Sequence, residues 1–519
     1  MVLFVVGSVN AQDAIINFPD PNFKNKLLFA HAGNSIAKNL EGNYFSIDTN
    51  NNNEIEISEA LQVSSLVMVP SPTIVSLEGI QYFTNLKHLN CNGNNIPSLD
   101  VSSLVQLETL LCAAQLTSLN VSGLVNLKLL VCGGSALTSL DISSLINLEQ
   151  LNIHLNNLTT LDLSNQPLLN TLTCSENQLN TLDLSNQPLL NYLSCNSNPN
   201  ISFIGLNNLV NLEQLYLNSC GLSTLDISNL SNLKNFECKY NDLTSLDLTG
   251  LSNLESVDCG YNQLTELNLT GLSSLNTLWC LYNDLVDVDF SGAPLLNFLH
   301  CTNNQFQNLD LSGLIHLDAY NMLDNPLVYL NIKSGKNWTD SDSNFRFITT
   351  LQHLCVDEYY INHAQQLANQ SENNCVINDY CSFTPGGTFY TINGINTLDS
   401  NNNGCDASDI SLPNLKFNIT DGSQTGTVTA NQSGQYSIPV YGGTHTITPI
   451  LENPALFTIS PATVSVTFPT TISPFTQNFC ITPNGLHPDL EVAILPTTPA
   501  RPGFDAEYKI LIKNKGNIQ

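Results

Sequence analysis

The chain has 519 residues, with 15 Lys and Arg against 44 Asp and Glu, so its formal net charge at pH 7 is −29. This length allows several domains, and a hydrophobic fraction of 42% argues against a disordered chain. The acidic composition argues against nucleic-acid binding, because neutralising phosphates requires clusters of Lys and Arg. No stretch is apolar for long enough to cross a membrane as a helix.

Residues 1–11, MVLFVVGSVNA, combine an apolar run with small residues at Val9 and Ala11. This combination is typical of the end of a secretory signal, although no Lys or Arg precedes the run. The alternative is a buried first strand. We favour a signal remnant, and therefore expect a secreted or cell-surface protein.

Residues 12–69 are predicted to form an N-terminal cap. Within them, DTNNNNEIEISE at 48–59 has the ligand spacing of an EF-hand-type calcium loop, except that Asn53 stands where Gly is usual. The first, third, fifth, seventh (carbonyl) and twelfth positions hold Asp48, Asn50, Asn52, Glu54 and Glu59. We therefore predict a structural calcium site of modest affinity. The alternative is a solvated Asn-rich turn.

A repeat of about 21 residues dominates residues 70–332. Residues 181–191, TLDLSNQPLLN, duplicate residues 160–170 letter for letter, and the frame L-x-x-L-x-C-x-x-N-x-L-x-x-L-D-L recurs in about twelve turns. One such turn cannot bury its own leucines, so neighbouring turns must stack into a solenoid. Strand alternation then places the leucine and Cys columns inside and the residues between them on the open face.

At three positions of this frame, most turns carry the same polar or sulfur-containing residue. The residues at one such position in successive turns are called a column. Adjacent strands hold their side chains about 4.8 Å apart, farther than the Cβ separation of a disulfide, so the Cys column is predicted to be buried reduced thiols. The Asn column is predicted to bond backbone groups of adjoining turns. The Asp column, in L-D-L, is predicted to be a solvated stripe, with weak collective cation binding as the alternative. Its members are Asp100, Asp141, Asp162, Asp183, Asp226, Asp247, Asp289 and Asp310.

After residue 332 the period is lost. Residues 333–380 are predicted to form a C-terminal cap, in which a disulfide from Cys355 to Cys375 would staple the last turn. Residues 381–483 contain short strand-like runs broken by Gly, Ser, Asn and Pro, a pattern typical of an antiparallel β-sandwich. A second disulfide is predicted from Cys405 to Cys480, with Cys381 as a competing partner. Residues 484–519 are predicted to begin a further, incomplete β-domain.

These motifs resemble known families. The frame and the preceding cap resemble those of bacterial internalin-like leucine-rich repeat proteins, in which the repeats form a curved scaffold for binding other macromolecules. Residues 381–483 resemble prealbumin-like stalk modules (SD-repeat or Cna-B type) of bacterial surface proteins, chiefly through LDSNNNGCDASD at 398–409. Such modules often hold calcium in this loop, which implies ligands at Asp399, Asn401, Asn403, Asp406 and Asp409. Relatives of this architecture are exported by the type IX route.

A binding site is predicted on the concave face of repeats eight to eleven. Three tyrosines recur just beyond consecutive strands and are expected to form a ring ladder. Aromatic side chains with polar tips are enriched at contact surfaces. The predicted ligand-binding residues are Tyr192, Tyr216, Glu237, Tyr240, Asp258, Tyr261, Trp279, Tyr282, Phe298 and His300. The alternatives are that the tyrosines merely cover the solenoid edge, or that the site lies at Leu111, Leu129 and Val131.

The sequence thus predicts a mainly β protein: a leucine-rich repeat solenoid of about twelve turns followed by an antiparallel β-sandwich. We expect a non-enzymatic, monomeric protein that binds another protein on a cell surface. A carbohydrate-binding repeat protein is the first alternative. A β-helix polysaccharide-degrading enzyme is the second, and it would need basic beside acidic residues on one face, whereas the repeats contain few basic residues. Calcium is the only cofactor expected, and the nine His form no catalytic motif.

Overall fold

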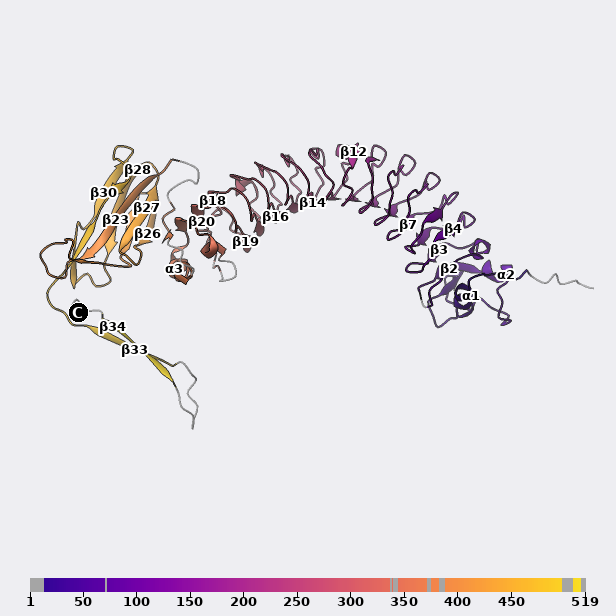
Figure 1. Cartoon of the computed structure of the whole chain (residues 1–519), viewed down its shortest axis with the longest axis horizontal. Helices are drawn as coiled ribbons and strands as arrows, with labels where there is room; N and C mark the ends of the chain where they lie inside the picture. The colour runs from indigo at the N-terminus through magenta and orange to yellow at the C-terminus, as the bar shows by residue number, and fades with distance from the viewer. Residues whose placement is uncertain are drawn as a thin grey trace, which may run out of the picture. The chain divides into compact units, whose positions relative to one another are not determined.

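The computed structural model describes residues 14–70, 72–336, 338, 344–370, 375–381, 388–496 and 507–514. The signal expected at residues 1–11 lies outside them. The chain divides into two compact units, residues 1–300 and 301–519, which run from indigo to red and from red to yellow in Figure 1. None of the described helices is long and apolar enough to span a bilayer.

The first unit opens with the cap. Its elements are α1 (Pro21–Leu28), β1 (Ala37–Asn39), α2 (Ile57–Ala60) and β2 (Val63–Val67). Asp20 caps α1 by accepting the backbone N–H groups of Asn22 and Phe23. Its second carboxylate oxygen accepts the N–H groups of Val75 and Ser76, at 2.6 and 3.0 Å, and so ties the helix to the first repeat.

A long parallel sheet follows, one short strand from each turn. Its first strand is β2 of the cap, which pairs in parallel with β3, so the cap and the repeats share backbone hydrogen bonds. The successive strands are β3 (His88–Asn90), β5 (Thr109–Leu111), β7 (Leu129–Val131), β8 (Gln150–Asn152), β9 (Thr171–Thr173), β11 (Tyr192–Ser194), β13 (Gln214–Tyr216), β14 (Asn235–Glu237), β15 (Ser256–Asp258), β16 (Thr277–Trp279) and β17 (Phe298–His300). Figure 1 shows β14 and β16 on the inner, concave side of this unit.

The opposite side of several turns carries further three-residue elements. These are β4 (Ser98–Asp100), β6 (Ser118–Asn120), β10 (Thr181–Asp183) and β12 (Ser202–Ile204), with 3-10 turns η1 (Ile80–Tyr82), η2 (Leu206–Asn208) and η3 (Phe290–Gly292). Strands β4 and β6 pair in parallel, as do β10 and β12. Apolar side chains from both sides meet inside the turns and are almost fully buried.

The Cys column lies in this core, as the 21-residue register predicts. Cys91, Cys132 and Cys259 are examples of its buried thiols, and burial raises the pKa of each to about 12. A thiol with this pKa is protonated at neutral pH and is a poor nucleophile or metal ligand. The column therefore acts as a stack of small hydrophobic groups.

Buried asparagines satisfy the backbone where each turn bends inward. The Asn177 Oδ1 accepts the N–H of Leu158 in the preceding turn at 3.1 Å. Its Nδ2 donates to the carbonyl oxygens of Ile153 and Cys174, at 3.0 and 3.1 Å. Cys220 replaces the Asn in one turn and donates its thiol to the Cys195 carbonyl instead. The structural role predicted for this column is confirmed.

The exposed Asp column has a local role that the sequence did not reveal. Each carboxylate accepts the backbone N–H two residues ahead, as Asp162 does from Ser164 at 2.9 Å, and so closes a side-chain turn. Hydrogen bonds from the hydroxyl and the backbone N–H of the serine two residues ahead lower the pKa of Asp141, Asp162 and Asp183. Asn120 makes the same bond, which shows that a neutral oxygen is sufficient.

These bonds predict acid sensitivity of the repeats. Because the folded-state pKa values are lowered, the stabilisation is complete above the unfolded value of about 3.9 and is lost as pH falls through the folded values. The triple variant Asp141→Asn, Asp162→Asn, Asp183→Asn should have a melting temperature close to that of wild type at pH 7. Between about pH 6 and pH 3, its melting temperature should fall by less than that of wild type. Equal acid sensitivity of the triple variant and wild type would contradict this role. Glu176→Gln, an exposed carboxylate outside the column, is the control.

The second unit continues the repeat pattern and ends it. Its elements here are β18 (Asn308–Asp310), β19 (Ala319–Asn321), β20 (Tyr329–Asn331), η4 (Asn344–Phe347), β21 (His353–Cys355), η5 (Glu358–Tyr360), α3 (Ile361–Gln370) and β22 (Val376–Asn378). Strands β18, β20, β21 and β22 pair in parallel in that order. Helix α3 covers the end of the core with Ala364, Leu367 and Ala368.

The disulfide predicted between Cys355 and Cys375 is wrong, because Cys355 bonds Cys381. Strand register explains the difference. Cys355 is opposite Asn378 of β22, whereas Cys375 precedes that strand and is three residues, about 10 Å, further back along it. Cys381 follows β22, and its Cα is 5.8 Å from that of Cys355. Cys375 remains a buried thiol, and burial raises its pKa to about 12.

The rest of this unit is a β-sandwich. Its strands are β23 (Tyr390–Leu398), β24 (Ile410–Ser411), β25 (Lys416–Thr420), β26 (Thr425–Thr429), β27 (Gln435–Val440), β28 (Gly443–Ile450), β29 (Phe457–Ser460), β30 (Val464–Phe468), β31 (Phe475–Thr476) and β32 (Phe479–Pro483). Most pairings are antiparallel, whereas β23 and β32 are parallel neighbours. A disulfide joins Cys405, which follows β23, to Cys480 in β32.

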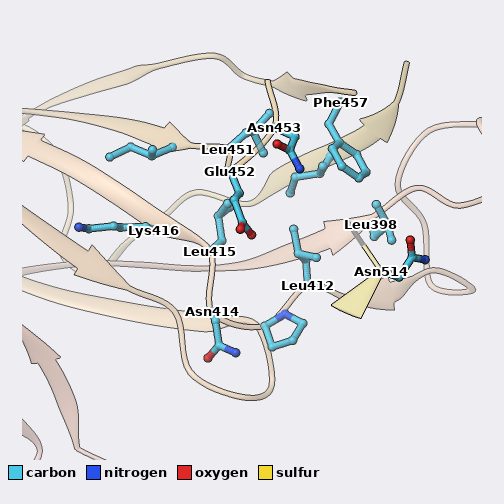
Figure 2. A pocket seen from close by; sticks show the side chains of 13 residues that line it. Leu398, Leu412, Asn414, Leu415, Lys416, Leu451, Glu452, Asn453, Phe457 and Asn514 are labelled. Atoms are coloured by element: carbon cyan, nitrogen blue, oxygen red, sulfur yellow. The ribbon is translucent and has the colours of Figure 1, made fainter. Parts of the chain in front are cut away.

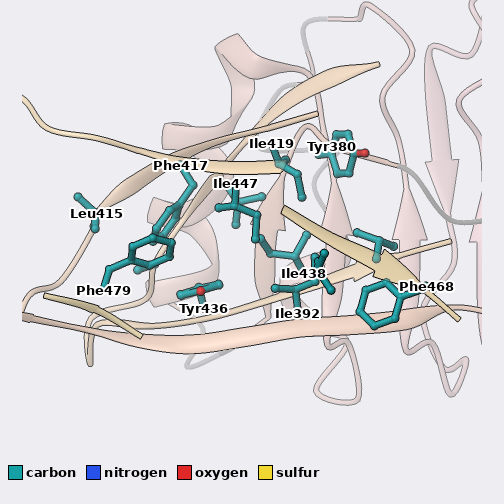
Figure 3. Packing of buried hydrophobic residues seen from close by; sticks show 14 of the residues in the cluster. Tyr380, Ile392, Leu415, Phe417, Ile419, Tyr436, Ile438, Ile447, Phe468 and Phe479 are labelled. Carbon is teal, nitrogen blue, oxygen red and sulfur yellow. The ribbon is translucent and has the colours of Figure 1, made fainter. Parts of the chain in front are cut away.

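The sandwich core extends to the end of the repeat cap. Figure 3 shows Phe417, Tyr436 and Phe479 packed together, with Tyr380 at the other end of the cluster. Tyr380 comes from the segment after β22, and its hydroxyl lies 3.0 Å from Nδ1 of His445. Strand β22 also pairs with β26, so one sheet runs from the repeats into the sandwich.

Residues near the C-terminus form an antiparallel hairpin of β33 (Leu490–Pro496) and β34 (Tyr508–Asn514). Lys513 of this hairpin contacts Glu452 at 2.8 Å. Val492 and Ile512 are cross-strand partners, as are Ile494 and Ile510, and all four side chains are exposed.

Candidate functional site

The concave sheet places five of the predicted binding residues in one row. Strand register sets Tyr216 beside Glu237, Glu237 beside Asp258, Asp258 beside Trp279, and Trp279 beside His300. Parallel strands lie about 4.8 Å apart, so the row crosses five adjacent turns with side chains pointing the same way. It combines aromatic ends with an acidic centre.

Two more aromatic residues flank this row at the first position of their strands. The Tyr192 ring lies 5.5 Å from that of Tyr216, and the Phe298 ring lies 5.4 Å from that of Trp279. Phe298 also meets the His300 ring edge-on at 6.4 Å. Burial lowers the pKa of His300, although the charge of Asp258 opposes the shift. The sequence predicted these residues as one surface, and the structure places them on adjoining strands.

Lys239 joins the row at its acidic centre, which the sequence analysis missed. Its ammonium lies 3.1 Å from Asp258 and 3.7 Å from Glu237. Burial lowers the pKa of Lys239, but the hydrogen bond to Asp258 and the charges of both carboxylates raise it by more, so the pKa is raised. The residue therefore stays a cation at neutral pH. Its position just after strand β14 and the Cys column was the signal available in the sequence.

The three tyrosines form the predicted ladder beside the sheet. The Tyr240 and Tyr261 ring centroids are 4.3 Å apart, those of Tyr261 and Tyr282 are 4.4 Å apart, and both pairs are stacked. Tyr240 and Tyr282 are 52% and 40% exposed. Both faces of the Tyr261 ring are covered by its neighbours. The ladder therefore presents ring edges and hydroxyl groups to a partner, which weakens the case for sugar rings stacking along it.

Each ladder tyrosine has a positive φ, between 53° and 57°. The same position in other turns is left-handed too, and Gly93 and Gly134 occupy it without strain. A residue with a side chain loses about 1–2 kcal/mol there. Leu155, Glu176 and Asp324 hold the same conformation in other turns, so the left-handed backbone belongs to the repeat frame and not to the tyrosines alone.

This strain predicts an unusual order of stability at position 261. Tyr261→Gly should be more stable than Tyr261→Ala by about 1 kcal/mol, because both lose the ring stacking and only Gly accepts the left-handed backbone. Thermal melting of the full chain measures the difference. An alanine variant as stable as the glycine variant would contradict the argument. A suitable control is Thr270, which lies outside this position and should show the opposite order for Gly and Ala.

The predicted calcium loop at 48–59 is closed by internal hydrogen bonds. Asp48 accepts the N–H groups of Asn52 and Asn53, and Asn53 has the positive φ that the predicted sharp turn requires. Glu59 accepts the N–H of Thr49 at 2.7 Å. Glu54 pairs with Lys24 at 2.7 Å.

Glu56 is a further residue of this loop that the sequence analysis missed. It is buried, and its carboxylate accepts the side-chain amides of Asn52 and Asn50, at 2.6 and 3.1 Å. Hydrogen bonds from Asn52 and other neighbours lower the pKa of Glu56. Its place at the ninth position of the loop was the available signal.

The sandwich loop at 399–409 repeats the same hydrogen-bond pattern. Asp399 accepts the N–H groups of Asn403 and Gly404, as Asp48 does four and five residues ahead in the cap. Asn401 accepts the Asn403 N–H at 3.0 Å, as Asn50 does from Asn52. Asp409 accepts the N–H of Ser400, the loop position that Glu59 binds in the cap. Asp409 therefore reaches the second position of its loop, as Glu59 does in the cap.

Asp406 does not bond to the second loop position, because one of its carboxylate oxygens binds Ser408. It accepts the N–H and hydroxyl groups of Ser408, at 2.7 and 2.6 Å. Across the described residues of both units, no three His, Cys, Asp or Glu side chains form a group suited to a metal ion. Calcium binding by either loop therefore stays a prediction.

A cavity of about 470 Å3 opens at one end of the sandwich. Figure 2 shows Leu398, Leu412 and Phe457 among the residues that line it, together with Lys416 and Glu452. The apolar walls continue the sandwich core, and we assign this cavity no ligand.

The repeat sheet, the buried Asn and Cys columns and the outward aromatic row define a leucine-rich repeat solenoid followed by an antiparallel β-sandwich module. Among solved structures, it is similar to the functional domain of InlJ from Listeria monocytogenes, with 22% identity over 91% of this chain and 98% of that chain and a TM-score of 0.49. That structure is described as including a cysteine ladder.

Two other leucine-rich repeat structures are also similar at low identity. The internalin InlF from Listeria monocytogenes is 24% identical over 68% of this chain and 93% of that chain, with a TM-score of 0.45. YopM from Yersinia enterocolitica is 20% identical over 57% and 60% of the respective chains, with a TM-score of 0.41. No protein-family model matches the sequence, and a search of curated proteins finds no match.

Proposed function

We propose that this chain is an extracellular, non-enzymatic scaffold that recognises another protein through the concave face of strands β11 to β17. The observation that carries the proposal is the continuous surface of Tyr192, Tyr216, Trp279, Phe298 and His300 around an acidic centre. Aromatic residues that are partly exposed on a rigid sheet are the usual anchors of protein interfaces. The repeats already fix the spacing of these side chains, so binding a partner costs little additional conformational entropy.

The charge of the first unit supports a partner with a basic contact surface. Residues 74–300 contain four Lys and no Arg against nineteen Asp and Glu. Lys234 and Lys239 already pair with carboxylates of neighbouring turns, at 2.8 and 3.1 Å. A Lys or Arg of the partner would find unbalanced carboxylates and ring faces here, and such contacts mainly raise association rate and specificity.

The enzymatic alternative is weaker at this face. A polysaccharide lyase needs Lys or Arg to hold acidic sugars, whereas Lys239, the lysine of the row, is already paired with Asp258 and Glu237. A carbohydrate-binding role of the concave face is the second candidate, favoured only by the faces of Trp279 and Phe298, because the tyrosine ladder offers edges.

The binding surface is tested with the double variant Trp279→Ala, Tyr261→Ala. Immobilised full-length chain captures partners from a cell-surface protein fraction, and captured proteins are identified by mass spectrometry. Loss of two interface anchors should weaken binding by at least about tenfold. The double variant Leu168→Ala, Leu189→Ala removes exposed apolar side chains elsewhere on the turns and is the control. Undiminished capture by the first variant would place the site elsewhere, with Leu111, Leu129 and Val131 as the next candidates.

We propose that both Asn-rich loops bind calcium. The support is their shared arrangement: left-handed residues at the fourth and sixth loop positions, Asn51 and Asn53 in one and Asn402 and Gly404 in the other. Asp399 and Glu59 are almost fully buried, and a cation would balance such carboxylates. On binding, loop oxygens that now accept internal hydrogen bonds would coordinate the calcium ion instead.

Calorimetry of the full chain tests this proposal. Wild type should bind two calcium ions with dissociation constants of about 10⁻⁴–10⁻³ M, the range of extracellular modules. Glu59→Gln and Asp399→Asn should each leave one ion, and each should remove part of the thermal stabilisation by calcium. Magnesium at the same concentration is the control. Absence of calcium binding by wild type would reject both sites, and an unchanged stoichiometry in one variant would reject that loop.

A further inference from the structure

An apolar patch runs along one side of the repeats, outside the concave strands. Four residues before its strand, each turn has an exposed position, and in six consecutive turns this position is aliphatic or Pro. These residues are Val105, Val125, Ile146, Pro167, Pro188 and Val210. In the two turns that carry Pro, the next residue, Leu168 or Leu189, is exposed as well. We call these eight residues the side patch.

The repeat frame does not require apolar residues at the exposed position. Ser231, Ser252 and Ser273 occupy it in the three turns after Val210, and all three are exposed. The backbone is the same in both cases, because the N–H of Val210 and that of Ser231 each bond the carbonyl two residues back, at 2.9 and 3.0 Å. The aliphatic residues of the side patch therefore need another explanation than folding of the turn.

Leu168 and Leu189 replace a residue with a structural role. In other turns this position holds Asn, and the amide of Asn147, for example, donates to a carbonyl of the preceding turn at 2.8 Å. In the two leucine turns, Gln166 and Gln187 bond the preceding turn from inside the solenoid instead. The two leucines thus lose an amide contact and are 39% and 48% exposed.

The side patch is large enough to form the centre of a protein interface. Its six aliphatic side chains are between 39% and 51% exposed. They expose roughly 500 Å2 in total, which is in the range of the largest apolar patches of monomeric proteins. A stable interface buries about 800 Å2 per partner, and homodimer interfaces are about 65% apolar. The side patch and the Ser, Asn and Gln residues around it fit both values.

The charge and composition of the side patch favour a second copy of this chain as the partner. The four-residue segments that carry the patch, such as 103–106 and 144–147, contain no charged residue in any of the six turns. Two acidic chains can therefore meet here without bringing carboxylates into contact. The patch also lacks Tyr and Trp, the usual anchors for recognising a different protein, which lie on the concave face. Anionic lipid headgroups would be repelled by the net charge of −29.

We propose that the side patch joins two copies of this chain into a homodimer. Aliphatic side chains of one copy pack against those of the other, at the spacing of about 4.8 Å that stacked turns impose. None of the eight residues belongs to a concave strand, so the dimer contact is separate from the protein-recognition face. The monomer expected from the sequence is then the form at low concentration.

Sedimentation velocity of the full chain over a range of concentrations tests the proposal. Wild type should show a monomer–dimer equilibrium with a dissociation constant of about 10⁻⁶–10⁻⁵ M. The double variant Leu168→Ser, Leu189→Ser should raise this constant at least tenfold, because the burial of two aliphatic side chains is lost. Val286→Ser removes an aliphatic side chain that is 57% exposed outside the side patch, and this matched control should dimerise as wild type.

A further variant extends the side patch instead of removing part of it. Ser231→Val continues the aliphatic column by one turn and should lower the dissociation constant several-fold. The backbone at this position accepts Val, as Val210 shows in the preceding turn. Added salt screens the repulsion between two acidic chains and should not weaken the dimer.

Four results would overturn the proposal. One is a chain that stays monomeric at every concentration; loss of partner capture by Leu168→Ser, Leu189→Ser would then assign the side patch to a different protein. Another is a dimer whose dissociation constant is the same in wild type and in that variant. The third is a dimer that added salt dissociates. The last is loss of the dimer in Trp279→Ala, Tyr261→Ala, which would place the contact on the concave face.

Discussion

Each turn of the solenoid must satisfy backbone groups that bend into an apolar core, and the rest of the structure depends on how it does so. Asn177 and its equivalents solve this with one amide that bonds the preceding turn and its own. A second set of amides, including Asn126, Asn147 and Asn232, donates to carbonyl oxygens of the preceding turn on the outer side. These bonds fix the stacking distance, and the stacking distance in turn sets the spacing of every outward side chain. The aromatic row and the tyrosine ladder are consequences of that spacing.

The repeated part of the fold could be predicted because its signal is periodic. About twelve turns share one spacing of Leu, Cys and Asn, so Leu172, Cys174 and Asn177 could be placed in the core from that spacing alone. The same periodicity placed Tyr240, Tyr261 and Tyr282 in one column before any contact was known. It could not give the orientation of the rings, which decides whether faces or edges meet a partner. That property depends on side-chain packing, which sequence spacing does not contain.

Outside the repeats the sequence was less informative, for two physical reasons. Disulfide partners depend on strand register, and the three-residue difference between Cys375 and Asn378 along β22 was not encoded in any spacing. The contacts of loop carboxylates depend on backbone turns, so the sequence analysis overlooked Glu56 and could not show that Asp409 reaches the same loop position as Glu59.

The continuity of strands β22 and β26 has a mechanical consequence. Asp379 accepts the backbone N–H and the hydroxyl of Thr427, and its own carbonyl accepts Lys333, so the last repeat strands and the sandwich are fastened by several bonds close together. The Tyr380 ring is buried in the sandwich core, and the Cys355–Cys381 bond anchors the segment that carries it. Tension applied through the sandwich would therefore load these bonds together and reach the repeat core directly. Within the second unit, the last repeat strands and the sandwich would then yield together rather than in separate steps.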